Sequence, residues 1–356
     1  MSKGAVLVAM SGGVDSSVAA CLLLEQGYEV VGSHLRLVRL DGVEHGCCGP
    51  AARRDAAEVA RIAGFPFEIH DLSDEFERTV IGDFVAEHEA GRTPNPCARC
   101  NGEIKFGAFL RRADELGIDS VATGHYVRTD RSSGRLLLLR GADRAKDQSY
   151  MLHMLGQRQL SRSRFPVGGM AKAQTRAAAE RYGLPVASKP DSQELCFAPS
   201  GDAGAYLASA APHLMRDGEV VDTDGRVLAR HAGSAAFTVG QRRGLGVSGP
   251  EPSYVLEIDA RANRVIVGPE ELLARSGAIA DRVSWVAGEP PSQVPFEAEV
   301  RIRYRGEDVP SVVESLGDAM RIEFRTPQRG VSPGQSAVVY RGEELLGGGR
   351  IVDALR

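Results

Sequence analysis

The sequence predicts an α/β protein with three parts: a parallel-sheet domain over residues 1–200, a small β-rich domain over 201–275 and a C-terminal antiparallel β-barrel or sandwich over 276–356. Short β-rich runs alternate with helical patterns up to about residue 130, which is typical of a parallel sheet covered by helices on both faces. Beyond residue 200 the patterns become strand-rich, with strict two-residue alternation over 296–304. A chain of 356 residues is long enough for two or three domains.

The expected elements follow this order along the chain. The apolar run Ala5–Ala9 predicts the first strand, and the pattern after it predicts the first helix. In the rest of the first domain we expect strands at 29–35, 66–70 and 119–123, a hairpin at 126–140, and helices at 51–63, 74–89, 101–116, 147–155 and 172–182. The turn-rich run 199–202 begins the central domain. The proline-rich run 288–295 predicts a linker, and barrel strands are expected at 296–304, 320–325, 336–340 and 349–353.

Composition limits the function classes. A net charge of −4, with 43% hydrophobic and 25% charged residues, is ordinary for a globular enzyme and provides no overall attraction to nucleic acid. Any RNA must therefore bind local patches. No apolar run is long enough to span a membrane and the start lacks a secretory signal, so we expect a cytoplasmic protein without a membrane partner. Six cysteines, all before residue 200, indicate chemistry or metal binding rather than a disulfide framework.

The segment Ser11–Ser17, SGGVDSS, follows the first strand and enters the first helix. Glycines, hydroxyls and helix N-terminal amides at such a junction can hold a phosphate. A Walker A loop is excluded because the chain contains no Gly-Lys pair. The segment resembles the signature of the N-type ATP pyrophosphatases, which makes Asp15 a predicted Mg²⁺ contact. The alternative is a glycine-rich turn that only caps a helix.

Three cysteines lie in unusual surroundings. Cys97 and Cys100 form a C-x-x-C pair at the mouth of a predicted helix, where the helix terminus and nearby arginines are expected to lower the pKa of the Cys100 thiol. Cys196 lies in a polar, turn-like segment, unlike a typical buried cysteine. An adenylated carbonyl needs a nucleophile, and a persulfide is a strong one. Taken singly, each cysteine is equally compatible with a structural role. Cys47 and Cys48, beside His45, could join this chemistry, although such vicinal pairs are more often incidental.

The ordered motifs resemble the tRNA-specific 2-thiouridylase family over essentially the whole chain. They are SGGVDSS, GRTPNPCARCN, EIKF, ATGHY, KDQSY, FPVG, DSQELCF, GQRRGLG, RYR and SPGQSAVVY. The resemblance implies a PP-loop ATP pyrophosphatase domain, a central β domain and a C-terminal barrel. It also implies ATP-dependent thiolation of wobble uridine 34 in tRNAs of the Lys, Glu and Gln type, with sulfur from a cysteine desulfurase, directly or through a relay protein.

The resemblance also implies residue roles. Cys196 would carry the persulfide, and Cys100 would form a disulfide with it or otherwise assist sulfur transfer. The implied ATP-binding residues are Ala9, Met10, Ser11, Gly12, Gly13, Val14, Asp15, Ser16, Leu35 and Gly124. The implied tRNA contacts are Asn95, Pro96 and Cys97 at the target base, with His125, Lys146, Asp147, Gln148, Arg303, Tyr304 and Gln335.

The chain departs from the family pattern at Cys97. In the best-known form of the family this position is an aspartate, which is a candidate general acid or base. The catalytic role of Cys97 therefore stays open. Because three thiolates can hold a cluster with one open iron, Cys97, Cys100 and Cys196 could instead ligate a [4Fe-4S] cluster.

A local basic patch is the expected tRNA surface. Seven basic residues against Glu180 alone indicate a phosphate-binding face, supported by the arginines of 301–305. The seven are Arg158, Arg162, Arg164, Lys172, Arg176, Arg181 and Lys189. Two alternatives to a thiouridylase remain: another PP-loop enzyme, such as an amidotransferase-type synthetase, and a non-catalytic tRNA-binding module.

Overall fold

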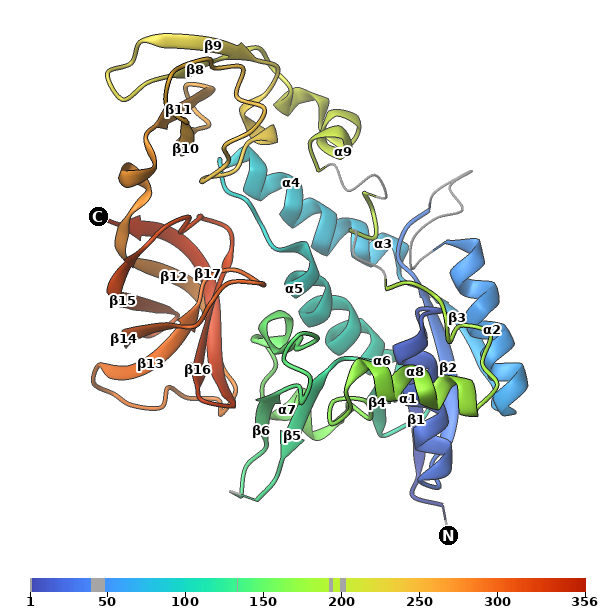
Figure 1. The fold of residues 1–356 in the computed structure, drawn as a ribbon. Coiled ribbons are helices and arrows are strands. Elements are labelled where there is room, and N and C mark those ends of the chain that lie inside the picture. The colour runs from blue at the N-terminus through green and yellow to red at the C-terminus, as the bar shows by residue number, and fades with distance from the viewer. Residues whose placement is uncertain (1, 40–48, 133, 192–194, 199–202) are drawn as a thin grey trace.

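The computed structural model describes residues 2–39, 49–132, 134–191, 195–198 and 203–356 (Figure 1). The described strands form a five-stranded parallel sheet, a four-stranded sheet and an eight-stranded sheet. The predicted fold class, a PP-loop α/β domain followed by a β-rich domain and a barrel, is confirmed. The domain boundaries at 200 and 275 stay predictions. The expectations for His45, Cys47, Cys48 and the run 199–202 lie outside the described residues.

The first sheet has the strand order β3-β2-β1-β4-β7, and all its pairings are parallel. Strand order reverses beside β1, because the next strand in the chain lies on one side of it and β4 lies on the other. In open α/β sheets such a switch point is where ligands bind, beyond the carboxyl ends of the strands. The loop after β1 therefore starts at the expected position for a site. The strands are β1 (Ala5–Ala9), β2 (Glu29–Arg36), β3 (Phe67–Asp71), β4 (Ser120–Ala122) and β7 (Ser163–Arg164).

Helices bury both faces of β1. Val6 and Val8 pack in one apolar cluster with α1 (Val14–Glu25), α2 (Pro50–Ala63) and α8 (Lys172–Arg181). Leu7 points the other way, into a cluster built on two longer helical stretches. This alternation explains why a wholly apolar run forms a central strand. The two stretches are α3 (Ser73–Phe76), π-helical η1 (Glu77–Ile81) and α4 (Gly82–Glu89), then α5 (Pro96–Cys100), π-helical η2 (Asn101–Ala108) and α6 (Phe109–Glu115).

The predicted hairpin is confirmed as β5 (Val127–Asp130) and β6 (Leu137–Arg140). It also extends the barrel sheet, because Leu138 of β6 pairs with Leu345 of β17 (Glu344–Leu355). After it, the expected helix at 147–155 is only the short 3₁₀ helix η3 (Ser149–Leu152), followed by α7 (Gln157–Ser161). The expected helix at 172–182 is confirmed as α8.

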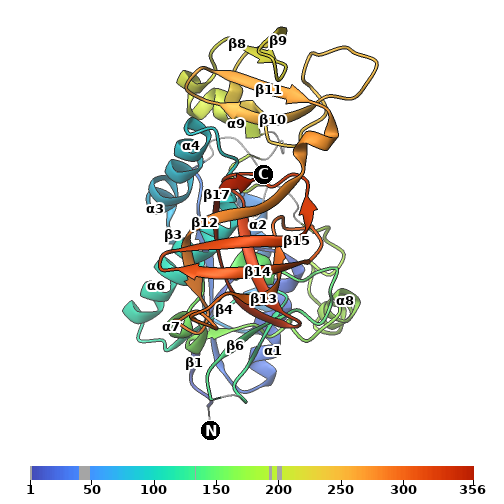
Figure 2. The same cartoon turned by 90° about the vertical axis from the view of Figure 1, so that its left-hand side faces the viewer.

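The barrel closes where β17 pairs with β12 as well as β16 (Figure 2). The run 288–295, predicted as a linker, joins β12 to β13 and so separates two strands of one sheet. The strand expected over 296–304 ends at Arg301, and Gly306 N donates to Arg303 O (2.9 Å) in a tight turn. The other barrel strands are β12 (Arg275–Trp285), β13 (Phe296–Arg301), β14 (Val309–Leu316), β15 (Ala319–Gln328) and β16 (Ser336–Arg341).

The central domain has its own sheet, in the order β10-β11-β8-β9, and its own small apolar core around Val220 and Val265. Its strands are β8 (Gly218–Val221), β9 (Val227–His231), β10 (Tyr254–Asp259) and β11 (Arg264–Gly268). Its helical elements are α9 (Ala203–Ala210) and the 3₁₀ helices η4 (Pro212–Leu214), η5 (Ser234–Ala236) and η6 (Glu270–Leu273).

A buried arginine fastens the hairpin to the barrel. Arg140 is 1% exposed, and its guanidinium donates to Asp308 Oδ2 (2.8 Å). The same group lies 3.5 Å from the centre of the Tyr340 ring and 3.9 Å from the Asp147 carboxylate. Arg301 also pairs with Asp308, at 2.8 Å. This network joins the segment after the hairpin to two barrel strands.

Replacing Arg140 with Ala is expected to lower the free energy of unfolding of the barrel by about 3–5 kcal/mol, because it removes a fully buried side chain and leaves the buried carboxylate of Asp147 with Arg301 as its one remaining cation in the described part of the chain. Urea unfolding followed by the fluorescence of Trp285, the single tryptophan, which lies in the barrel core, measures the change. The matched control is Arg325→Ala, which removes an exposed pair with Glu297 and should leave the midpoint unchanged. Equal effects of the two variants would contradict a fastening role for Arg140.

Candidate functional site

The loop between β1 and α1 is pressed against α2. Gly12 has a φ of +71°, and a Cβ there would lie 2.1 Å from the carbonyl oxygen of Ala52, so only glycine fits. The hydroxyls of Ser16 and Ser17 donate to Gly13 O (3.2 and 2.9 Å) and hold the turn. Among the described residues no side chain caps the N-terminus of α1. Its first amides are therefore available to an anion.

A cavity of about 840 Å³ opens in front of this loop and is named here the nucleotide cavity. Cys196 lies in its wall together with the loop, although the two are far apart in the sequence. The barrel contributes the turn at Tyr304. The structure thus brings together three separately predicted segments. The lining residues used below are Ser11, Asp15, Lys146, Asp147, Gln148, Lys172, Lys189, Asp191, Cys196 and Tyr304.

Charged side chains converge at the mouth of the loop. Lys172 Nζ donates to both oxygens of Asp15 (2.7 and 2.8 Å) and lies 2.8 Å from Asp191. The Tyr126 hydroxyl donates to Asp15 Oδ1 (2.8 Å). Lys146 and Arg176 also contact Asp191, at 2.8 and 3.2 Å. Burial opposes ionisation of Asp191, but the hydrogen bonds and charges of Lys146 and Lys172 outweigh it and lower the pKa of Asp191 to about 2.

The three predicted thiols are neighbours. Cys196 is half-buried and interacts electrostatically with Cys97 and with Cys100, since its charge raises the pKa of both. Cys97 is open to solvent although protein atoms crowd its sulfur, and this desolvation raises its pKa to about 11. Cys100 is 7% exposed, and burial raises its pKa to about 12 against the opposing charge of Lys105. The predicted lowering of the Cys100 pKa is therefore wrong: Cys100 ends α5 and is buried, so desolvation dominates.

A smaller cavity of about 250 Å³ contains much of the predicted base-binding set. Asn95, Pro96 and Gln335 line it, and Tyr304 and Leu195 line both this cavity and the nucleotide cavity. The barrel holds the loop in place, because Gln335 Nε2 donates to Thr93 O (2.8 Å) and Thr93 N donates to Pro333 O (2.8 Å). Two motifs far apart in the sequence are thus one structural unit.

Two other predicted tRNA contacts, Asp147 and His125, are buried. Asp147 is 7% exposed and accepts hydrogen bonds from Ser149. His125 is 7% exposed beside Phe106 and Phe165, and this burial lowers its pKa well below the usual value. In this conformation neither side chain offers an open surface to RNA. Gln148 accepts from Tyr126 N (2.9 Å) at the cavity wall, and Arg303 is exposed on the barrel turn.

The remaining predicted ATP contacts support the loop from behind. Met10 and Leu35 are core residues, and Ala9 ends β1. Gly124 packs on the start of α1, since a Cβ there would lie 2.5 Å from Ser16 N. A side chain at Gly124 would therefore push the phosphate loop away.

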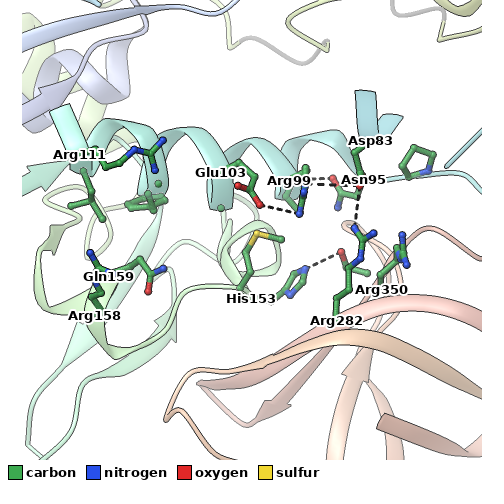
Figure 3. Close-up of a pocket in the computed structure, with 18 of the residues that line it drawn as sticks. Asp83, Asn95, Arg99, Glu103, Arg111, His153, Arg158, Gln159, Arg282 and Arg350 are labelled. Carbon is green, nitrogen blue, oxygen red and sulfur yellow. Dashed lines mark hydrogen bonds and ion pairs between the residues drawn. The ribbon is translucent and has the colours of Figure 1, made fainter. Parts of the chain in front are cut away.

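The basic patch expected over 158–189 is not one face. Lys172, Arg176 and Lys189 gather near the loop, whereas Arg164 stacks on Tyr28 and Arg181 pairs with Glu25. Arg158 and Arg162 line a third cavity, of about 580 Å³, between α5–α6 and the barrel. Figure 3 shows that acidic side chains accompany the arginines of this cavity: Arg99 pairs with Glu103 (3.0 Å) and Arg282 with Asp83 (3.1 Å).

Of the two predicted metal groups, Mg²⁺ fits this site better than the iron–sulfur cluster does. Within the described part of the chain, no set of three or more Cys, His, Asp or Glu side chains is arranged to hold a metal ion. The iron–sulfur cluster is therefore not supported. Mg²⁺ needs fewer protein ligands, because it usually takes one or two carboxylates and completes its coordination shell with phosphates and water. Asp15, in the first turn of α1, offers such oxygens.

Sequence reasoning missed the charge-bearing partners of the loop. Lys172 and Arg176 were assigned only to an RNA face, and Asp191 and Tyr126 were assigned no role. One signal was present: a phosphate loop without its own lysine needs a cation from another segment.

The loop and its place in the sheet define the class, an α/β protein with the phosphate loop of the ATP pyrophosphatases. Family models match residues 4–200 (tRNA methyl transferase HUP domain), 206–269 (tRNA methyl transferase PRC-barrel domain) and 275–351 (aminomethyltransferase β-barrel domain). A tRNA-specific 2-thiouridylase MnmA of Acidithiobacillus ferrooxidans is 47% identical over 353 residues, covering 99% of each chain. The one of Symbiobacterium thermophilum is 45% identical over 361 residues, covering 98% of this chain and 92% of its own. The chain belongs to the tRNA-specific 2-thiouridylase family.

Solved structures are more distant. A 4-thiouridine synthetase–RNA complex with bound ATP is 16% identical with a TM-score of 0.34, covering 52% of this chain and 43% of its own. An NMN synthetase of Francisella tularensis is 15% identical with a TM-score of 0.33, covering 54% and 67%. Neither similarity is close enough to bear on function. Separately, no helix among the described residues is long and apolar enough to cross a membrane.

The raised pKa of Cys97 has a measurable consequence. Below its pKa the thiol stays protonated, so alkylation of Cys97 by iodoacetamide should rise about tenfold per pH unit from about pH 7 to pH 10. Peptide mapping by mass spectrometry measures the rate at this one residue, with glutathione in the same tube as reference. The raised pKa would be contradicted if the labelling rate of Cys97 levelled off at the same pH as that of glutathione or at a lower pH.

Proposed function

We propose that this chain is a tRNA 2-thiouridine synthase that adenylates the C2 oxygen of wobble uridine 34 with ATP and then replaces that oxygen with persulfide sulfur. The products are 2-thiouridine, AMP and pyrophosphate. The observation that supports this most directly is that Cys196 and the SGGVDSS loop line the same cavity of about 840 Å³. The membership of the chain in the thiouridylase family supports the substrate.

The chemistry explains why both groups must meet at one base. The C2 oxygen of uracil is a poor leaving group, so it first attacks the α-phosphorus of ATP, and the anhydride electrons leave with pyrophosphate. Sulfur then attacks C2, and the C2–O bond breaks as AMP departs. In the disulfide route, the Cys100 thiolate attacks the Cys196 sulfur of the persulfide, forms the disulfide and releases the terminal sulfur as the nucleophile. A thiol reductant must then restore the two cysteines.

In this proposal the loop residues Ser11–Ser16 hold the phosphates, with Asp15 as an oxygen ligand for Mg²⁺. When bound, Mg²⁺ neutralises charge on the phosphates. The smaller cavity would take the flipped base between Asn95–Pro96 and Tyr304. A base in a single-stranded loop can be turned out at a modest cost in stacking. Lys146, Gln148 and the exposed Arg303 would contact the RNA at the rim.

Several finer assignments stay part of the proposal. The sulfur donor is a cysteine desulfurase or a relay protein, the tRNAs are of the Lys, Glu and Gln type, and the compartment is the cytoplasm. No step is assigned to an iron–sulfur cluster. An amidotransferase-type synthetase or a non-catalytic RNA module would leave the thiols beside the loop without a purpose, which is why we favour the thiouridylase.

The decisive variant is Cys196→Ser. It should abolish 2-thiouridine formation while tRNA affinity stays within about twofold, because one sulfur atom contributes little to a large RNA interface. Mass spectrometry of nucleosides from substrate tRNA, incubated with ATP and a persulfide donor, measures the product, and filter binding measures affinity.

The matched control is Cys21→Ala. Cys21 is also a cysteine but is buried in α1, so this variant should keep its activity. Normal thiolation by Cys196→Ser would overturn the assigned role. Failure of the unmodified protein to release pyrophosphate with substrate tRNA would overturn the proposed function as a whole.

A further inference from the structure

The phosphate loop of this chain contains no lysine, yet a lysine from a distant helix lies at its mouth. Lys172 Nζ is 2.7 Å from a carboxylate oxygen of Asp15, which stands in the first turn of α1. Its side chain is only 12% exposed. The ammonium therefore lies beside the uncapped helix N-terminus where an anion would bind.

The position of Lys172 is fixed by its helix. It is the first residue of α8, and its backbone N donates to Asp143 Oδ2 (3.0 Å). Arg176 follows four residues later on the same face of α8. Its guanidinium is oriented by the carbonyl of Ala187 (2.6 Å). Two cations of one helix are thus held toward the same place.

The carboxylate of Asp191 forms ion pairs with these cations. Asp191 accepts from Lys172, Lys146 and Arg176 (2.8, 2.8 and 3.2 Å), and Asp15 also pairs with Lys172, so three positive charges meet two negative charges. The wall of the nucleotide cavity also carries an excess of positive charge, because six basic side chains, Lys146 and Lys172 among them, line it against the three carboxylates of Asp15, Asp147 and Asp191. The carboxylates neutralise these cations incompletely, whereas a pyrophosphate group carries enough charge to do so.

We propose that Lys172, with Lys146, binds the β- and γ-phosphates of ATP, and that Asp191, which Arg176 holds in place, competes with these phosphates for the two lysines. This inference rests on the proposed function and adds to it the residues that receive the leaving group. Lys172 replaces the lysine that a Walker A loop would carry. Asp191 thereby weakens nucleotide binding.

The two residues predict opposite effects on one measurement. Lys172→Met should weaken the binding of a non-hydrolysable ATP analogue about 10- to 100-fold, because a charge-assisted hydrogen bond is lost. Asp191→Asn should tighten it severalfold, because a neutral amide is a poorer competitor of similar shape. Lys172→Arg, which keeps the charge, should restore most of the affinity. Isothermal titration calorimetry with Mg²⁺ and the full-length protein measures all of these.

The matched control is Arg181→Met. It removes a cation from the same helix, but one that pairs with Glu25 away from the cavity, and it should leave affinity for the analogue unchanged. Thermal unfolding midpoints and tRNA binding show whether each variant is folded.

If Asp191→Asn binds the ATP analogue more weakly, the proposed competition is wrong, because loss of a carboxylate that only supports the site would lower the affinity. Unchanged binding by Lys172→Met would overturn the phosphate contact. Absence of analogue binding by the unmodified protein would instead overturn the proposed function, so the two failures are distinguishable.

Discussion

The buried Arg140 guanidinium is the contact on which the composite site depends. It holds the carboxylate of Asp308 from the barrel and lies beside Asp147 from the segment after the hairpin. A charge this deeply buried persists only when its partners are in place, so the hairpin and the barrel keep one relative position. That position sets Tyr304 of the barrel turn over a cavity whose floor is the phosphate loop. The nucleotide cavity is thus built by two domains, neither of which has it alone.

Neutralisation of charge organises the cavity itself. Asp15 and Asp191 are held by the same ammonium, and the Tyr126 hydroxyl adds a donor to Asp15. The environment of the thiols disfavours negative charge. Burial and the charge of Cys196 raise the pKa of Cys97 and Cys100, so both stay protonated at neutral pH. In the proposed disulfide route, the surroundings of Cys100 must therefore change before it can act as a thiolate.

Much of this organisation could be predicted from the sequence because its causes are local. Alternating patterns located the strands, and the glycines of SGGVDSS located the loop, since Gly12 needs its positive φ and its close approach to Ala52. The failures have long-range causes. The burial of Asp147, the raised pKa of Cys100 and the pairing of the hairpin with β17 all depend on segments far away in the chain. Lys172 belongs to the same group, because the order of residues does not reveal which helix end faces the loop.

The pairing of β6 with β17 constrains how the protein is made. Strand β6 is synthesised early, but its neighbour Glu344–Leu355 leaves the ribosome only after the central domain and the other barrel strands. Until then the edge of β6 that pairs with β17 in the finished molecule has no strand beside it. Such an edge is an aggregation hazard and a long-range contact that closes slowly. The nascent α/β domain is therefore the state of this chain that most needs a chaperone.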